Sequence, residues 1–245
     1  MSKELKSEGK CLYCSKMFLK AGITKHLNTH LEELQASQKT LKKAFHLRIE
    51  GIPFFFYEAK EMFLNLLVDG DGSLGDLDDF LREIWLECCG HMSTFRIKGK
   101  EYEDDWDDEE AEMGEKKATK MSKVFQENML IDYEYDMGST TPLVIKVVTA
   151  LNIKTSEPIQ LLSRNEPLAI MCGICQQKPA AVLCSIHIGE TPEAFVCKTC
   201  KGKHAKNCPD FKDYAALPIV NSPRMGTCAY EGGMIDKKRD GIFKG

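Results

Sequence analysis

The chain has 245 residues, of which 43% are hydrophobic, and a formal net charge of −4, a composition typical of a globular protein. No apolar run is as long as a membrane span and the N-terminal "MSKELKSEGK" contains no apolar signal region, so we expect a cytoplasmic protein with no membrane partner. Eleven cysteines in such a chain favour metal binding or catalysis over disulfides.

Charge is spread unevenly along the chain. Residues 1–48 contain ten Lys and Arg against four Asp and Glu, and residues 172–245 contain eleven against seven. Residues 49–171 contain twelve against twenty-six. Basic ends can attract the phosphates of a nucleic acid, whereas the acidic middle repels them.

The first motif is "CLYCSKMFLKAGITKHLNTH", with the spacing C-x₂-C-x₁₁-H-x₃-H. Two thiolates and two imidazoles, the latter one helical turn apart, form a tetrahedral zinc set, and Phe18 and Ile23 supply a small core. The segment resembles the C2H2 zinc finger, with one residue fewer than usual between the second Cys and the first His. We expect a finger over residues 9–32. Its ligands are Cys11, Cys14, His26 and His30.

The finger helix would present Lys20, Thr24 and Lys25 to a partner. One finger contacts about three base pairs, which is too few for sequence-specific DNA binding. The motif therefore predicts zinc, and it does not by itself predict a DNA target.

A linker helix is expected at residues 33–44, followed by a domain at 45–155. "FHLRIEGI" alternates like a strand, and "PFFFYEAKEM" is expected to be its hairpin partner. "SLGDLDDFLREIWLECCG" has helical periodicity, with Ser73 or Asp76 as its cap and Gly90 as its end. Three further strands are expected in "MSTFRIKGKEY", "NMLIDYEYDMGS" and "TPLVIKVVTAL". This order predicts an α+β fold, a small mixed sheet with a covering helix, flanked by two zinc-stabilised modules.

Three stretches of this domain, "HLRIEGIPFFFYEAKEMFLNLL", "LGDLDDFLREIWLECCGHMSTFRI" and "YEYDMGSTTPLVIKVV", resemble the plasmid pRiA4b ORF-3-like family. The family is also described as passenger proteins of certain insertion sequences. The resemblance implies a small α+β domain associated with mobile elements, and it implies no established biochemical role.

Catalysis in this domain is the less favoured interpretation. A Cys–His pair such as Cys88 and His91 can form a nucleophile, but Cys88 falls on the apolar face of the expected helix and no third, orienting residue is evident. A packed helix end is the preferred interpretation. Ten of the fifteen residues from Glu101 to Glu115 are acidic, which is typical of a solvated loop and, alternatively, of a cation site or a mimic of nucleic-acid charge.

A second Cys/His-rich segment at residues 168–212 contains four ligand pairs with two- or three-residue spacers. Pairs of this kind in alternation resemble cross-braced modules that hold two zinc ions, with the first and third pairs at one ion and the second and fourth at the other. Sequential pairing, or one Cys₄ ribbon, remains open. The four pairs are Cys172/Cys175, Cys184/His187, Cys197/Cys200 and His204/Cys208.

Lysines alternate with these ligands. They either contact the phosphates of a nucleic acid or simply cover a solvent-exposed face of the module. They are Lys198, Lys201, Lys203 and Lys206. The tail at residues 213–245 contains Cys228, which is a spare ligand, a packed thiol or a reactive one. This tail resembles the "NSPRxGxCxYxG" ending of zinc-bearing relatives.

Together these features predict a non-enzymatic protein with about three zinc ions. We expect it to bind nucleic acid weakly and to be associated with mobile elements. A protein–protein adaptor is the alternative because lone fingers and cross-braced modules also bind proteins. An enzyme with its active site in the ORF-3-like domain is the second alternative.

Overall fold

The computed structural model describes residues 7–53, 62–103 and 115–235. Within them, one sheet of ten strands dominates, in the order β2-β1-β10-β4-β3-β9-β8-β5-β6-β7. Neighbouring strands are antiparallel from β2 to β6, and β7 joins β6 in parallel. The strands are β1 (Glu8–Cys11), β2 (Met17–Leu19), β3 (Lys43–Gly51), β4 (Met62–Asp69), β5 (Ser93–Ile97), β6 (Lys100–Glu103), β7 (Glu115–Lys116), β8 (Leu130–Tyr135), β9 (Thr141–Asn152) and β10 (Ile159–Asn165).

The fold is therefore mixed, with a much larger sheet than the small one that we expected. The sheet takes in β1 and β2 from the N-terminal finger segment, and β10 from beyond residue 155. Strand β10 was not predicted, although it lies between β1 and β4 and joins the finger segment to the rest of the sheet.

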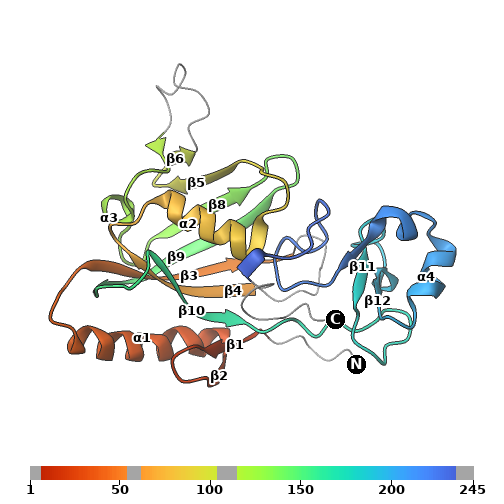
Figure 1. Cartoon of the computed structure of the whole chain (residues 1–245), viewed down its shortest axis with the longest axis horizontal. Helices are drawn as coiled ribbons and strands as arrows, with labels where there is room; N and C mark the ends of the chain where they lie inside the picture. The colour runs from red at the N-terminus through yellow and green to blue at the C-terminus, as the bar shows by residue number, and fades with distance from the viewer. Residues whose placement is uncertain (1–6, 54–61, 104–114, 236–245) are drawn as a thin grey trace, which may run out of the picture.

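Helices cover both faces of the sheet, where we expected one face to be covered. Helix α1 (Lys20–Ser37) lies along one face and α2 (Leu74–Leu81) along the other (Figure 1). In β3, Ala44 belongs to the cluster under α1, and Phe45 and Leu47 belong to the cluster under α2. Because both faces are buried, β4 is a continuous buried run, "MFLNLLV", instead of an alternating one.

The finger helix and the expected linker helix at residues 33–44 are one element. Helix α1 ends at Ser37, and β3 has begun by Lys43. Leu27 and Leu31 are buried at helical spacing, and partly buried Leu34 continues this apolar stripe past the finger, which explains why the helix does not stop at the finger's end.

A buried histidine also connects α1 to the sheet. The two ring nitrogens of His46 lie 2.8 Å from Asn28 Oδ1 on α1 and 3.0 Å from Asn65 Oδ1 on β4. Burial lowers the pKa of His46 to about 4, so the ring is neutral at pH 7. A neutral ring donates from one nitrogen only, so it connects helix and sheet without a buried charge when one of the two amides turns its NH₂ group toward the other ring nitrogen.

Helix α2 begins at the predicted cap. Ser73 and Asp76 form a capping box, in which each side chain accepts the other residue's backbone N–H. Its end was predicted wrongly, because the helix widens into a π-helical turn at Arg82–Leu86 and stops before Gly90. Cys88 consequently lies in the loop after the helix and is not part of its apolar face.

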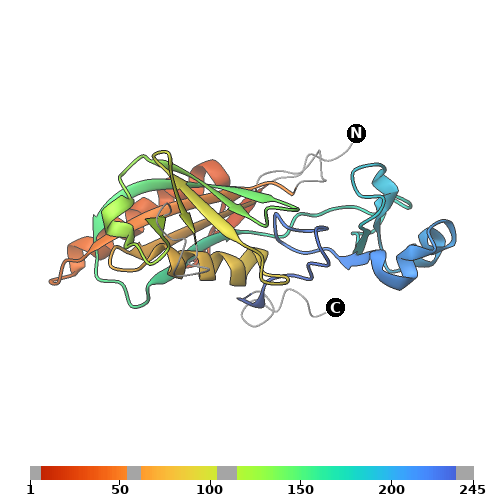
Figure 2. The ribbon, with the colours of Figure 1, turned by 90° about the horizontal axis from the view of Figure 1, so that it is seen from above.

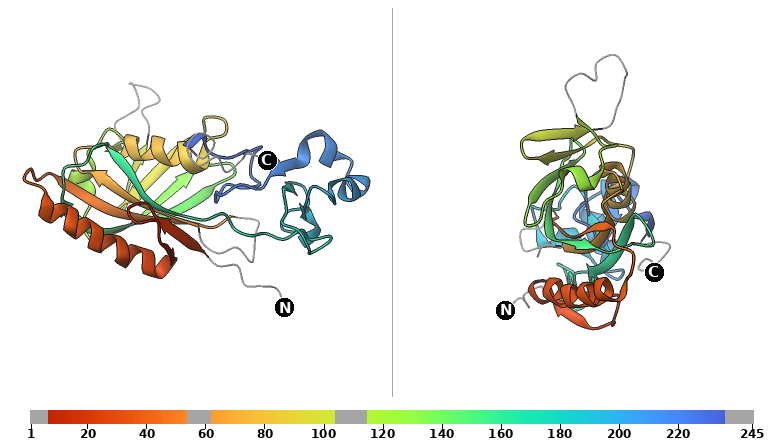
Figure 3. Two further views of the ribbon diagram at one scale, coloured as in Figure 1. Left: turned by 60° about the horizontal axis from the view of Figure 1, so that its bottom comes forward. Right: turned by 90° about the vertical axis from the view of Figure 1, so that its left-hand side faces the viewer.

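The C-terminal segment forms a second, three-stranded sheet at one end of the molecule (Figure 2). The chain then turns back, and residues 219–235 pack against the end of α2 (Figure 3). Ser222 Oγ donates to the carbonyl of Trp85 at 2.6 Å. The remaining elements are α3 (Met121–Val124), β11 (Val182–Cys184), a 3₁₀ turn (Pro192–Ala194), β12 (Phe195–Val196), α4 (Lys201–Asn207), a π turn (Phe211–Ala215) and β13 (Ala216–Pro218).

Two expected features lie mostly outside the described residues. They are the hairpin partner "PFFFYEAKEM" and the acidic run at 101–115. Among the helices of the described residues, none is long and apolar enough to cross a bilayer.

Substitution in α1 should destabilise the sheet as well as the finger. Leu27 is fully buried between helix and sheet, so Leu27→Ala is expected to cost about 2–5 kcal/mol of unfolding free energy. Urea unfolding in zinc-containing buffer, followed by circular dichroism, measures the change. Leu41→Ala, at a leucine that is 61% exposed, is the control and should cost little. Equal midpoints for the two variants would contradict this arrangement of α1.

Candidate metal centres

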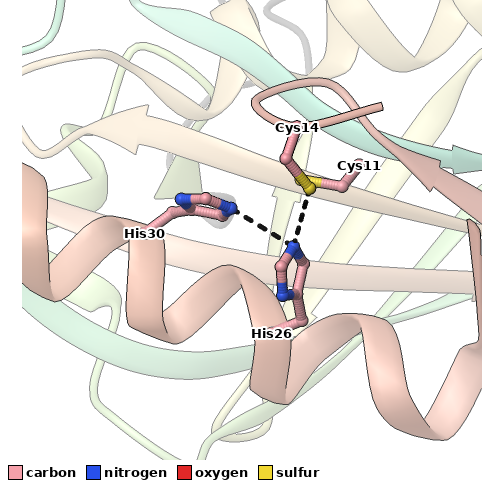
Figure 4. Close-up of side chains that lie close together, drawn as sticks. All are labelled: Cys11, Cys14, His26 and His30. Atoms are coloured by element: carbon pink, nitrogen blue, oxygen red, sulfur yellow. Dashed lines mark hydrogen bonds between the residues drawn. The ribbon is translucent and has the colours of Figure 1, made fainter. Parts of the chain in front are cut away.

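The finger residues come together as the spacing predicted. Strands β1 and β2 form a hairpin with Cys11 at the end of β1 and Cys14 in the turn, and α1 carries both histidines (Figure 4). Nε2 of His26 lies 3.1 Å from Cys14 Sγ and 3.2 Å from His30 Nε2. The backbone N–H of Lys16 donates to the Cys14 sulfur and, with the two histidines, lowers its pKa to about 6, which favours the thiolate.

These distances fit a zinc ion. A tetrahedron with Zn–S of about 2.3 Å and Zn–N of about 2.0 Å has edges of about 3.3–3.8 Å between its ligand atoms. The four ligand atoms of the finger all lie within 4.8 Å of one another. Phe18 stacks on His26 with ring centroids 4.1 Å apart, so the aromatic residue of the motif packs directly on a ligand.

The C-terminal segment forms two separate clusters, and the ligand pairs alternate between them. The first contains Cys172, Cys175, Cys197 and Cys200, and the second contains Cys184, His187, His204 and Cys208. Sulfur–sulfur distances of 3.9 Å in each, and 3.4 Å between Cys184 Sγ and His187 Nδ1, are close to tetrahedral edges. This is the cross-braced arrangement that alternating pairs predicted, and zinc occupancy stays a prediction.

Two features of these clusters suit a bound cation. Nε2 of His204 is buried and has no hydrogen-bond partner among the described residues, as expected of a nitrogen that binds a metal. Burial and the neighbouring thiols of Cys197 and Cys175 raise the pKa of Cys200 to about 12. Four crowded thiols therefore resist ionising together unless a cation compensates the charge.

A fourth group, which we call the tail cluster, was not predicted as a metal site. It consists of Cys88, Cys89, His91 and Cys228, whose ligand atoms also lie within 4.8 Å of one another. The first three follow α2, and Cys228 comes from the C-terminal tail 137 residues after His91. Four Cys/His groups among the described residues could therefore hold metal ions.

Sequence spacing could not reveal this cluster because its fourth member is distant in the chain. The signal that existed was the tail motif "NSPRMGTCAY". Its Arg224 is fully buried, and Nη2 donates to Asp136 Oδ2 at 2.6 Å. Although burial opposes ionisation of Asp136, the Arg224 guanidinium and two backbone N–H groups hold the pKa of that carboxyl below its usual value.

The tail cluster does not have the geometry of a catalytic triad. Cys89 Sγ lies 2.8 Å from His91 Nε2, and Asp136 Oδ2 lies 3.5 Å from the same nitrogen. A triad needs the carboxylate at the opposite ring nitrogen. The neighbouring thiols of Cys88 and Cys228 also raise the pKa of Cys89 to about 12, which disfavours a thiolate nucleophile.

Asp78, a buried carboxylate in the ORF-3-like region, is surrounded by hydrogen-bond donors from the domain core. Asp78 accepts hydrogen bonds from Tyr133 Oη at 2.6 Å and Ser93 Oγ at 2.7 Å, and from Arg82 Nε and Lys117 Nζ. Burial opposes its ionisation, but these partners hold its pKa below the usual value. All four partners belong to the domain core, so this aspartate stabilises the domain's packing.

The six lysines considered for nucleic-acid contact are placed differently. Lys20 Nζ forms an ion pair with Glu50 at 3.2 Å and is only partly exposed. The other five are exposed: Lys25 on α1, Lys198 in the loop before α4, and Lys201, Lys203 and Lys206 on α4.

Comparison with known proteins finds a family match for the central part of the chain. Residues 58–169 match the family model for plasmid pRiA4b ORF-3-like protein. This supports the expected resemblance of the middle of the chain, and the matched range extends past 155 to include β10.

A search of solved structures finds a weak similarity, and a search of curated proteins finds none. A crystal structure of a protein of unknown function from Methanosarcina mazei Go1 is similar with a TM-score of 0.40 and 18% identity, over 51% of this chain and 68% of that chain. No significant match is found among curated proteins.

Paired substitutions test how the C-terminal ligands divide between two ions. Cys175 and Cys200 share a cluster, so Cys175→Ser with Cys200→Ser should lower the bound zinc by one ion per chain. Cys175→Ser with Cys184→Ser affects both clusters and should lower it by two. Elemental analysis of protein purified without added zinc measures the content. Sequential pairing predicts the reverse order, and that result would contradict the cross-brace.

Proposed function

We propose that this chain is a zinc-stabilised binding protein without catalytic activity of its own. One zinc ion would be bound by the finger and two by the C-terminal module. The support is that each of these clusters supplies four protein ligands, the number that fills a tetrahedral structural site and leaves no position for a substrate. Bound zinc would neutralise the clustered thiolates and fix the short segments that carry them.

The finger itself is poorly suited to reading a DNA sequence. In the docking mode of C2H2 fingers, bases are contacted by helix positions −1, 3 and 6. Because α1 begins at Lys20, these positions are Leu19, Gly22 and Lys25. Leucine and glycine side chains cannot hydrogen-bond to base edges, and the buried face of the helix packs on the sheet.

The exposed lysines of the C-terminal module are the best candidates for contacting a nucleic acid. Lys198, Lys201, Lys203 and Lys206 lie in one nine-residue stretch around α4 and are exposed. Exposed Glu190 and Glu193 on the same module reduce the local positive potential. We therefore propose weak binding through phosphates, without sequence preference. A role in mobile-element biology rests on the ORF-3-like resemblance alone.

A protein partner is the second candidate, and one feature of the module favours it. Tyr214 is 68% exposed and Ile186 is 38% exposed. Ser185 N–H donates to the carbonyl of Ala215 at 2.9 Å, so these two exposed side chains belong to neighbouring segments. Exposed aromatic and aliphatic side chains are common in protein interfaces.

Replacing the four module lysines should weaken nucleic-acid binding equally for all sequences. Fluorescence anisotropy with random DNA and RNA duplexes, at several salt concentrations, measures the affinity and its salt dependence. Each lost phosphate contact should reduce the slope of log K against log salt by about 0.9 on B-DNA.

The control replaces four exposed lysines elsewhere in the structure, so that the net charge changes equally. They are Lys10, Lys39, Lys123 and Lys154. Equal losses for both quadruple variants would contradict a role for the α4 surface. A preference of about a thousandfold for one short DNA site would contradict sequence-independent binding.

A further inference from the structure

We propose that the tail cluster is a fourth zinc site, which fastens the C-terminal tail to the ORF-3-like domain. It lies outside the three sites proposed above and is built differently. Its ligands come from the loop after α2 and from the tail, and Cys89 and Cys228 are exposed. Zinc is the expected metal because three thiolates and one imidazole form a common structural donor set for it.

The distances within the cluster resemble those of a tetrahedral site. Cys89 Sγ lies 3.5 Å from Cys88 Sγ and 3.6 Å from Cys228 Sγ. Cys228 Sγ lies 3.6 Å from His91 Nε2. These values match tetrahedral edges of about 3.3–3.8 Å. The distance between Cys89 Sγ and His91 Nε2, 2.8 Å, is shorter than such an edge.

The loop that carries three of the ligands is held in shape by the protein itself. Gly90 has φ +74°, a conformation that lets the chain reverse between Cys89 and His91, and its N–H donates to Glu87 Oε1 at 2.6 Å. Arg82 donates to Glu87 Oε2 at 2.9 Å and to the His91 carbonyl at 2.6 Å. Hydrogen bonds from Arg82 and to Glu87 therefore hold the backbone of the ligand loop in place.

The fourth ligand is presented by an unusual backbone conformation. Cys228 and Ala229 have φ of +49° and +43°, which residues with a side chain rarely adopt. Such conformations persist where the surrounding structure requires them, and they occur at functional sites. Here the turn brings the Cys228 thiol to the three ligands of the α2 loop.

A buried guanidinium also contacts one ligand of the cluster. Arg224 Nη2 donates to Cys88 Sγ at 3.3 Å and to Asp136 Oδ2 at 2.6 Å, so it is shared between a ligand thiol and a carboxylate. Hydrogen bonds to ligand atoms of this kind orient and stabilise metal ligands.

A disulfide between Cys89 and Cys228 is the competing use of the same residues. It would use two sulfurs and leave Cys88 and His91 with no role in the cluster. The convergence of four donor atoms is better explained by a metal ion than by one disulfide, because Arg224 donates to Cys88 Sγ and Arg82 to the His91 carbonyl, two residues that the disulfide would leave unused.

Elemental analysis of full-length wild-type protein and a Cys228→Ser variant tests the proposal. Both are purified under reducing conditions without added zinc. The variant should contain one zinc ion fewer per chain than the wild type. The difference between the two proteins reports the fourth site whatever the total, so its result is separate from the three-zinc proposal. Glu231→Ser, at an exposed tail residue outside the cluster, is the matched control and should retain the wild-type content.

Alkylation of the wild type provides a second measurement that needs no variant. With bound zinc, Cys88, Cys89 and Cys228 should resist iodoacetamide until a chelator is added, although two of them are exposed. Equal zinc contents in wild type and Cys228→Ser would overturn the proposal. Rapid alkylation of these thiols without a chelator would overturn it too, as would a Cys89–Cys228 disulfide found by mass spectrometry of protein isolated without reductant.

Discussion

Burial of both faces of strands β3 and β4 is the constraint on which the rest of the structure depends. Their side chains alternate between a cluster beneath α1 and a cluster beneath α2, and in β3 only Lys43, Arg48 and Glu50 keep some exposure to solvent. A sheet of this kind needs a cover on each face. The ORF-3-like segment supplies α2, and the finger segment supplies α1.

This arrangement connects the finger cluster to the stability of the whole sheet. The hairpin of β1 and β2 carries two ligands and lies at the sheet's edge against β10, and α1 carries the other two ligands and covers the sheet. A metal ion in the finger would therefore fix the edge strands relative to the covering helix. The Cys/His cluster of this segment is therefore part of a larger core and not a separate module.

The sequence predicted the local parts of the structure well. Ligand pairs three or four residues apart, such as Cys11 with Cys14 and His26 with His30, lie together because a knuckle or a helical turn places them so. The alternation of pairs also predicted the cross-braced clusters. The Ser73 capping box follows from short-range hydrogen bonding in the same way.

Features that depend on distant contacts could not be predicted. Strand β10 is paired with β1 on one side and β4 on the other, and its own seven residues, "IQLLSRN", give only a weak strand signal. The end of α2 was misplaced because a π turn interrupted the helical periodicity. Cys228 meets His91 across 137 residues, and no spacing rule covers that separation.

The ion pair between Arg224 and Asp136 has a consequence for how the protein is made. Asp136 lies at the end of β8 and is nearly buried, and its guanidinium partner is 88 residues later in the chain. On the ribosome, the ORF-3-like segment emerges well before Arg224 does, and a buried carboxylate without its partner is strongly unfavourable. This corner of the nascent domain therefore stays open to water until Arg224 has been synthesised and has folded back. A chain that stops before Arg224 would leave Asp136 without this partner.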